Sequence, residues 1–375
     1  MSSLYEKYQL KQVINASGRM TILGVSTPAA DVAEGVNYGL NHFFEMQDLV
    51  NKTGAYIAGL LNVESAVIVS CASAGIAQSV AAVIVKDDAW LLENLHRAHN
   101  SESARDIVLP KGHNVNFGAP VSTMVMLGGG NPVEAGYANE CSAEQLAACI
   151  TPRTAAVLYI KSHHSVQKSM LSVAQAAAVA HERRLPLIVD AAAEEDLTAY
   201  YRMGADLVIY SGAKAIEGPT SGLVLGKAQC VEWVKLQSKG IGRAMKVGKE
   251  GILGLTQAIE RYVTLPKTTG RQMVDKMTSF IASLNALDGI SARVVWDGAG
   301  RDIARTEITF DEARLGWKTK EIVDALRNGD TAIYFRGYRA NEGKVEVDVR
   351  SVTPPQLEVI AGCIKNLLEG SRHEA

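Results

Sequence analysis

The chain has 375 residues, of which 47% are hydrophobic and 21% are charged. This length suits one large domain with a smaller one, and the composition excludes a disordered or fibrous polymer. Lys and Arg number 38 against 40 Asp and Glu, so the net charge of -2 argues against nucleic acid or an anionic membrane as a partner.

The amino terminus and the cysteines indicate a cytoplasmic location. Residues 1–10 contain Glu6 and Lys7 where a signal peptide needs an apolar run. The cysteines are odd in number and widely spaced, without a CxxC pair, which predicts neither a disulfide framework nor a zinc knuckle. They are Cys71, Cys141, Cys149, Cys230 and Cys363.

The run AVIVSCASAGIAQSVAAVIV at 66–85 contains 20 residues without a charge, which is long enough for a membrane span. Gly75 lies at its centre, several polar residues interrupt it, and neither a basic cluster nor an aromatic belt flanks it. We therefore predict a strand, a turn of small residues and a helix here, and no membrane partner.

Short apolar runs alternate with Ala-rich amphipathic stretches, which is typical of βαβ units in a mainly parallel sheet. The predicted strands are 66–70, 89–94, 121–127, 155–161, 186–190, 206–211 and 222–226. A helix is predicted between Lys161 and Pro186. The fold class is thus α/β, with a seven-stranded sheet in the large domain.

After Ala244 the pattern changes to α+β. A mostly helical stretch at 249–286 leads into strands at 291–296, 305–310, 331–336 and 344–350 and a closing helix from Pro354. We expect an amino-terminal segment at 1–50, a large domain at 51–266 and a small α+β domain at 267–375.

The segment ADLVIYSGAKAIEGPTSGLVLG places Lys214 after a predicted strand, among small residues. A lysine in such a loop has room for a bulky group on its amine, and it forms a Schiff base when it is neutral. Most lysines are surface charges, so this segment alone is weak.

In RRLPLIVDAAAEED another predicted strand ends at Asp190, 24 residues before Lys214. A carboxylate at this end of a parallel strand faces the ligand crevice of α/β proteins. Pyridoxal phosphate needs such a group beside its ring nitrogen, and the three alanines that follow leave a flat surface for the ring. The alternative is that Asp190 is a helix N-cap.

Small residues between the predicted strand and helix of 66–85 indicate a phosphate site. Ser73, Ala74 and Gly75 would offer backbone N–H groups at a helix amino end, and Ser211 would add a hydroxyl. The turn could also be simple packing, and no nucleotide-binding glycine pattern is present.

Histidines at 96, 99 and 113 are candidates to stack on the ring. His99 is preferred because it follows the strand predicted at 89–94, although His96 is three residues away. Zinc is disfavoured at the pairs His96/His99 and His163/His164, because no nearby cysteine or acidic residue completes a ligand set. We predict no metal.

Together, the phosphate turn SCASAG, the HNS stacking region, VDAAAE and SGAK resemble the fold type I, or aspartate aminotransferase-like, family of pyridoxal phosphate enzymes. The segments INASGRMTILG, YSGAKAIEGPTSGLVLG and GIGRAMKVGKEGI resemble its selenocysteine synthase branch. The chain begins almost at INASG, so the region that holds transfer RNA in that synthase is expected to be missing.

The resemblance implies roles for particular residues. Lys214 would bind pyridoxal 5'-phosphate and then act as the base, Asp190 would pair with the ring nitrogen, and His99 would stack on the ring. Ser73, Ala74, Gly75 and Ser211 would hold the phosphate. The candidates for binding the anionic ends of a substrate are Arg19 and Arg350, followed by Arg243 and Lys246.

Small relatives in this branch imply a lyase that removes ammonia from a 2-amino-3-hydroxy sugar acid phosphate to give a 2-oxo-3-deoxy acid phosphate. An aminotransferase would share every cofactor residue, and a selenocysteine synthase-like transferase is a further alternative. A scaffold protein would be expected to lack Lys214. The family also implies a homodimer or a higher homo-oligomer.

Overall fold

The computed structural model describes residues 3–97, 103–162, 164–298 and 301–371. By their contacts they divide into two units, Pro28–Leu265 and Met1–Thr27 with Pro266–Ala375. Residues 1–50 therefore do not form one segment, which corrects the grouping expected from the sequence. Strand β1 (Gln12–Ala16) pairs with β11 (Thr331–Phe335), whereas α2 (Ala30–Asn41) packs against α11 (Lys249–Thr264).

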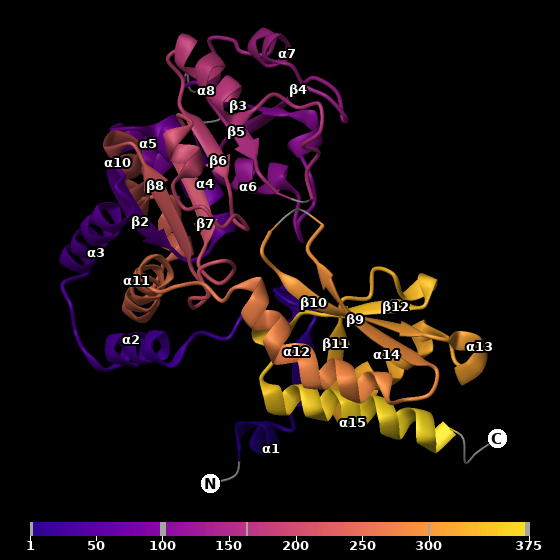
Figure 1. Ribbon diagram of the computed structural model, residues 1–375. Helices are drawn as coiled ribbons and strands as arrows, with labels where there is room; N and C mark the ends of the chain where they lie inside the picture. Colours follow the sequence, from indigo (N-terminus) through magenta and orange to yellow (C-terminus); the bar gives the residue numbers. More distant parts are fainter. Residues whose placement is uncertain (1–2, 98–102, 163, 299–300, 372–375) are drawn as a thin grey trace. The chain divides into compact units, whose positions relative to one another are not determined.

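The Pro28–Leu265 unit contains the predicted seven-stranded sheet (Figure 1). In spatial order its strands are β2 (Ser65–Val69), β8 (Gly222–Gly226), β7 (Leu207–Ser211), β6 (Leu187–Asp190), β5 (Thr154–Ile160), β3 (Asp106–Pro110) and β4 (Asn131–Ala135). Strand β8 is antiparallel to both of its neighbours, and the other pairs are parallel. Strand β2 consequently runs in the same direction as β7 and β6.

Helices cover both faces of this sheet, and alternate strand residues face each layer. On one face lie α3 (Met46–Leu61), α8 (Val173–Glu182) and α11, which pack on residues such as Ile68 and Val208. The other face packs on α4 (Ala72–Val85), α5 (Ala89–Asn94), α6 (Val121–Leu127) and α10 (Ala228–Leu236). Two short helices, α7 (Ala143–Ala148) and α9 (Ala199–Arg202), complete the unit.

Two predicted strands are wrong, because residues 89–94 and 121–127 form α5 and α6. Asp88 caps α5 by accepting a hydrogen bond from the Leu91 N–H, and Pro120 precedes α6, whose Val121 and Val125 are buried at helical spacing. The strands that take their place are β3 and β4. Edge strand β4 is only partly buried, so its apolar signal is weak.

The uncharged run at 66–85 forms β2 and α4, as predicted, although α4 begins at Ala72 and takes up most of the expected turn. Among the described residues, no helix is both long and apolar enough to cross a membrane.

The other unit has the predicted α+β character. A three-stranded antiparallel sheet has the order β12 (Lys344–Val347), β10 (Ala304–Phe310), β9 (Ile290–Trp296), and β1 pairs in parallel with β11. Its helices are α1 (Leu4–Tyr8), α12 (Gly270–Asn285), α13 (Glu312–Leu315), α14 (Thr319–Asn328) and α15 (Pro354–Ser371). Helices α12, α14 and α15 share one apolar core with the strands.

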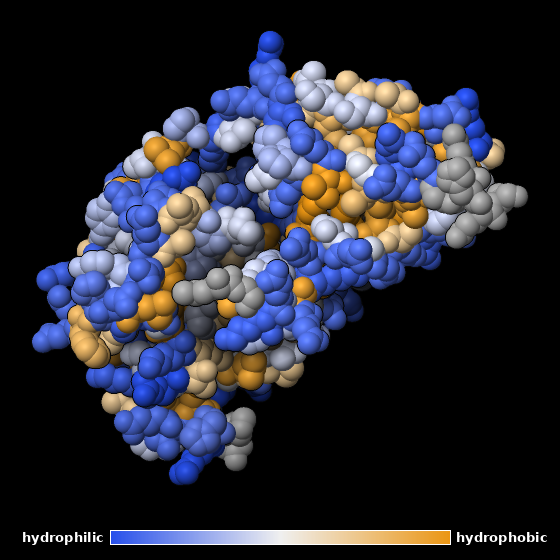
Figure 2. Space-filling view, turned by 90° about the horizontal axis from the view of Figure 1, so that it is seen from below, coloured by the Kyte–Doolittle hydropathy of each residue, from blue (hydrophilic) through white to orange (hydrophobic). Residues whose placement is uncertain are grey.

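Hydrophilic residues cover much of the face seen in Figure 2, with apolar patches between them. Several large apolar side chains are exposed at the end of α2 and just after it, among them Tyr38, Leu40 and Phe43. Phe43 is 99% exposed, so its ring contributes almost nothing to the core of its own chain.

Candidate active site

The carboxyl ends of β2, β7 and β6 meet at one edge of the large sheet. Residues Val69, Gly222 and Ser211 lie in register across β2, β8 and β7, and Asp190 pairs with Ile209 on the other side of β7. The predicted phosphate, lysine and aspartate segments all begin at this edge. This is the edge where open α/β sheets bind ligands.

Asp190 is a buried carboxyl, 7% exposed, with few partners. Its Oδ1 accepts a hydrogen bond of 3.1 Å from the Ala192 N–H, and no described residue donates to its Oδ2. Burial raises its pKa to about 6, although the Ala192 hydrogen bond and the charge of Lys214 lower it in part. A cation beside this carboxyl would therefore be strongly favoured.

Lys214 follows β7 in a tight turn and is half-buried. Its N–H donates to the Ser211 carbonyl at 3.3 Å, and its charge acts on Asp190. The turn is held by Gly212, whose N–H donates to the Ser221 carbonyl and whose carbonyl accepts from the Gly218 N–H, both at 2.8 Å. A Cβ on Gly212 would collide with Ser221 Oγ, so this loop needs a glycine there.

Helix α4 starts next to Ser211. A Cβ on Gly222 would lie 2.6 Å from the Cys71 carbonyl carbon, so Gly222 lets the start of α4 approach β8. No described residue accepts a hydrogen bond from the N–H groups of Ala72 or Ser73. Two free amides at the end of a 14-residue helix suit a phosphate.

The other two predicted phosphate amides have partners inside the helix. The Ala74 N–H donates to Cys71 Sγ at 3.3 Å, and the Gly75 N–H donates to the Cys71 carbonyl at 3.0 Å. Gly75 instead allows close packing, because a Cβ there would lie 2.9 Å from Ile209 Cγ2. Sequence reasoning placed the helix start too late and therefore missed Ala72.

The prediction that His99 stacks on the cofactor ring depended on a strand at 89–94, but these residues form a helix. His99 lies outside the described residues, and His96 is exposed in the turn after α5. His113, which follows the true strand β3, is fully buried. Its Nδ1 accepts from the Ile160 N–H and its Nε2 donates to the Val166 carbonyl, while burial lowers its pKa to about 4. His113 is therefore a neutral packing residue next to the site.

A second lysine at this edge was not predicted. Lys161 follows β5, its N–H donates to the Asp190 carbonyl at 2.8 Å, and its Nζ donates to Gln167 Oε1 at 3.0 Å. Its position at the end of the predicted strand AAVLYIK could have indicated that Lys161 lies at this edge. We note no cluster of histidine, cysteine and acidic residues that could hold a metal ion within the described ranges.

The basic residues that were predicted to bind the anionic ends of the substrate are divided between the two units. Arg19 and Arg350 are half-buried in the unit that contains both chain ends. Arg243 and Lys246 line a cavity of about 200 Å³ in the Pro28–Leu265 unit, together with β2 residues and Gln78.

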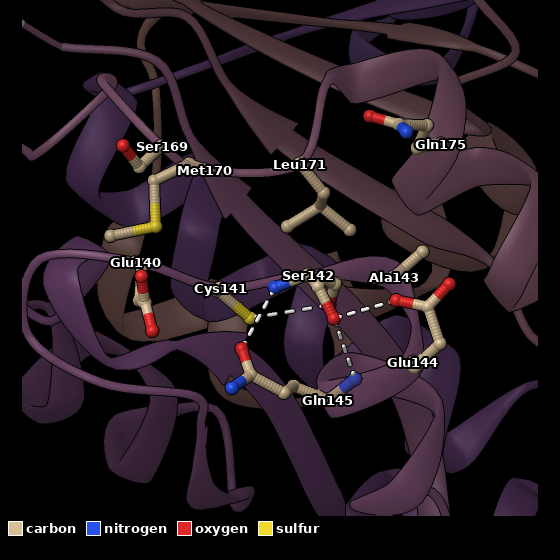
Figure 3. Close-up of a pocket in the computed structure, with 10 residues that line it drawn as sticks. All are labelled: Glu140, Cys141, Ser142, Ala143, Glu144, Gln145, Ser169, Met170, Leu171 and Gln175. Atoms are coloured by element: carbon tan, nitrogen blue, oxygen red, sulfur yellow. Dashed lines mark hydrogen bonds between the residues drawn. The ribbon is translucent and has the colours of Figure 1, made fainter.

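A larger open pocket of about 380 Å³ lies at the starts of α7 and α8 (Figure 3). It contains none of the predicted site residues. The helix ends here are already capped, since Ser142 and Gln145 cap α7 and Ser172 and Gln175 cap α8. At each start these caps take up the N-cap amide and the amide of the third helical residue.

Residues 63–287 match the family model described as L-seryl-tRNA selenium transferase. This match spans more than half of the chain and includes Asp190, Lys214 and the start of α4. The chain belongs to the selenium transferase family. The fold type I expected from the sequence is confirmed by this match and by the strand order of the sheet.

Within this family the chain is most clearly similar to smaller members. It is 41% identical, over 98% of both chains, to the D-glucosaminate-6-phosphate ammonia lyase of Salmonella typhimurium. A solved structure of a D-glucosaminate-6-phosphate ammonia-lyase has a TM-score of 0.93, with 40% identity, and 99% of each chain is covered. A 5'-C-glycyluridine monooxygenase-decarboxylase from Streptomyces is 35% identical over 97% of this chain and 92% of its own length.

Proposed function

We propose that this selenium transferase family member is a pyridoxal 5'-phosphate-dependent ammonia lyase. Its substrate would be D-glucosaminate 6-phosphate or a closely related 2-amino-3-hydroxy sugar acid phosphate. The observation that carries the proposal is the 41% identity to the ammonia lyase across nearly the whole of both chains. A cytoplasmic homodimer or a multiple of it is part of the same proposal.

The residues at the sheet edge fit the cofactor. Asp190 is buried with an unused carboxylate oxygen, which suits a protonated ring nitrogen, and Ala191 and Ala192 follow it with small side chains. The free amides of Ala72 and Ser73 suit its phosphate. When bound, pyridoxal phosphate supplies an electron sink that makes the substrate Cα proton acidic.

The side chains of this chain would do the rest. Lys214 would hold the cofactor, and its Nζ would also take the substrate Cα proton, because a neutral lysine amine is a competent base. Asp190 would stay ionised and keep the ring nitrogen protonated. The water lost with the 3-hydroxyl is regained when the imine is hydrolysed, so the net products are ammonia and a 2-oxo-3-deoxy acid phosphate.

The test is to incubate the purified protein, loaded with pyridoxal phosphate, with phosphorylated and unphosphorylated 2-amino-3-hydroxy sugar acids. Ammonia and oxo acid should appear in equal amounts without any added oxo acid. A requirement for a second oxo acid would show an aminotransferase. Oxygen uptake with carbon dioxide release would instead match the named activity of the Streptomyces relative.

Lys214→Ala should lose the visible absorbance of the lysine-bound cofactor and lower turnover by at least about 10²–10⁴-fold, as expected for loss of a general base. Lys168→Ala, at an exposed lysine of the same unit, is the matched control and should behave like the wild type. Retention of both absorbance and turnover in Lys214→Ala would refute the assignment.

A further inference from the structure

Three tyrosine hydroxyl groups converge on the loop that follows Asp190. We call residues 191–198 the acidic loop, because three acidic side chains follow one another in it. The tyrosines come from α9, α11 and β7, so three separate elements hold the acidic loop. Their hydrogen bonds run from Tyr200 to Glu194 Oε2 at 2.5 Å, from Tyr262 to the Glu195 carbonyl at 2.6 Å and from Tyr210 to the Asp196 carbonyl at 2.9 Å.

Tyr200 stays a neutral hydrogen-bond donor. It is 7% exposed, and burial together with the Glu194 carboxylate raises the pKa of its hydroxyl well above the usual range. A buried phenol needs a partner, and a hydroxyl that donates to a carboxylate makes a short, strong hydrogen bond. Because the partner of Tyr200 is a side chain, either member of the pair can be changed without altering the backbone of the acidic loop.

The acidic loop determines how Asp190 is oriented. The Glu194 N–H donates to the Ala191 carbonyl at 3.0 Å, and the Ala192 N–H donates to Asp190 Oδ1 at 3.1 Å. The Ala192 carbonyl accepts from the Ser211 N–H at 3.2 Å, which ties the same turn to the end of β7. Within the described ranges, the Ala192 N–H is the one hydrogen-bond donor to the Asp190 carboxylate. The orientation of this carboxylate therefore depends on where the acidic loop holds Ala192.

A carboxylate that pairs with a ring nitrogen has to be held in advance, because a displacement of about 1 Å weakens such a contact strongly. Without the Tyr200 hydroxyl, the half-buried Glu194 carboxylate would gain hydration by moving towards solvent, and the turn at 191–194 would move with it. We propose that Tyr200 is a positioning residue for the cofactor, because its bond to Glu194 holds the Asp190 carboxylate in place for the ring nitrogen. This rests on the proposed function, which assigns Asp190 to that nitrogen.

The experiment compares Tyr200→Phe, Glu194→Ala, Glu194→Gln and the Tyr200→Phe/Glu194→Ala double variant. Tyr200→Phe and Glu194→Ala are also placed in the Asp190→Asn background. The Kd of pyridoxal phosphate is measured by the absorbance of the lysine-bound cofactor, and kcat and KM are measured at saturating cofactor. Tyr137→Phe is the matched control and should behave like the wild type, since Tyr137 is 62% exposed in the same unit.

Tyr200→Phe and Glu194→Ala should each raise the Kd about 10-fold, as expected when a hydrogen bond to a charged group is lost. Glu194→Gln keeps an acceptor oxygen and should stay within about threefold, and the double variant should exceed either single one by no more than about twofold. At saturating cofactor, Tyr200→Phe should lower kcat about 10-fold and leave KM within about twofold, because Asp190 acts on the cofactor and not on the substrate.

The Asp190→Asn background separates positioning from general stability. There, Tyr200→Phe should change the Kd by less than about twofold, because the carboxylate that it positions is gone. A tyrosine that only stabilises the fold would act in both backgrounds. An equal rise in both, or an unchanged Kd in Tyr200→Phe, would overturn the proposal.

Circular dichroism shows whether the variants fold, and if Tyr200→Phe does not, Glu194→Ala in the two backgrounds decides in the same way. If Asp190→Asn binds no cofactor, Glu194→Gln decides, and a Kd as high as that of Glu194→Ala would overturn the proposal. A wild type that binds pyridoxal phosphate but releases no ammonia refutes only the proposed lyase, and the Kd series still tests Tyr200. A wild type that binds no cofactor overturns both.

Discussion

Two buried aspartates, one in each unit, have opposite electrostatic surroundings. Asp348 has two arginines within hydrogen-bonding reach and a pKa lowered to about 2. Asp190 has one amide hydrogen bond, the charge of Lys214 and a pKa raised to about 6. Burial penalises the charge of both carboxyls, so their protein partners make the difference.

The chain itself supplies the charged partners of Asp348, whereas one carboxylate oxygen of Asp190 is left for a ligand. Asp348 is satisfied by its own chain, so its substitution should affect stability first. Asp190 is left short of partners at a ligand-binding edge, which costs stability in the free protein and suits a cationic ligand. Substitution of Asp348 should therefore have the largest effect on stability, and substitution of Asp190 should act mainly on turnover.

Asp348→Asn should destabilise the protein by about 3–5 kcal/mol at neutral pH, because it leaves buried Arg305 with one carboxylate fewer. The folded pKa of Asp348 lies below its ordinary value of 3.8, so its stabilisation is present above that pH and is lost as the pH falls towards 2. The gap between variant and wild type in urea unfolding should therefore shrink between pH 5 and pH 2.5. A constant gap would show that folding does not shift the pKa of Asp348.

Asp190→Asn should instead act on turnover, lowering kcat by on the order of 10²–10³-fold, as for other preorganised electrostatic groups. An amide cannot keep the ring nitrogen of the cofactor protonated, although the cofactor can still bind at the site. The control is Asp48→Asn, at an exposed partner of Lys52 in the same unit. Turnover of Asp190→Asn within threefold of the wild type would rule out the pairing.

The sequence was sufficient to predict those strands whose apolar pattern matches their burial in the fold. The strands that end at Asp190 and Ser211 are buried on both faces, so they are continuous apolar runs. The segments around these residues and Lys214 were therefore placed correctly at one edge of one sheet. Their roles toward a cofactor stay predictions.

Other parts failed for identifiable reasons. The apolar runs at 89–94 and 121–127 are too short for periodicity to distinguish a strand from a buried helix. Because His99 was chosen as the stacking residue from the strand predicted at 89–94, that choice lost its support. The long-range pairing of β1 with β11 leaves no local signal, so residues 1–50 were grouped together. The partners of Asp348 come from β10 and its own neighbourhood, and no sequence spacing indicates them.

The smallest expected effect concerns Asp190 in the cofactor-free protein. Its folded pKa of about 6 lies above its ordinary value of 3.8, so the protein loses stability as the pH rises through that range. Asparagine carries no charge at any of these pH values. Between pH 5 and pH 8, the stability of Asp190→Asn relative to the wild type should therefore rise by on the order of 1 kcal/mol. Thermal unfolding of both cofactor-free proteins measures this, and cofactor loading should reverse the order at pH 8, because a cation then accompanies the wild-type carboxylate. A relative stability that does not change with pH would mean that Asp190 is already ionised and satisfied without the cofactor.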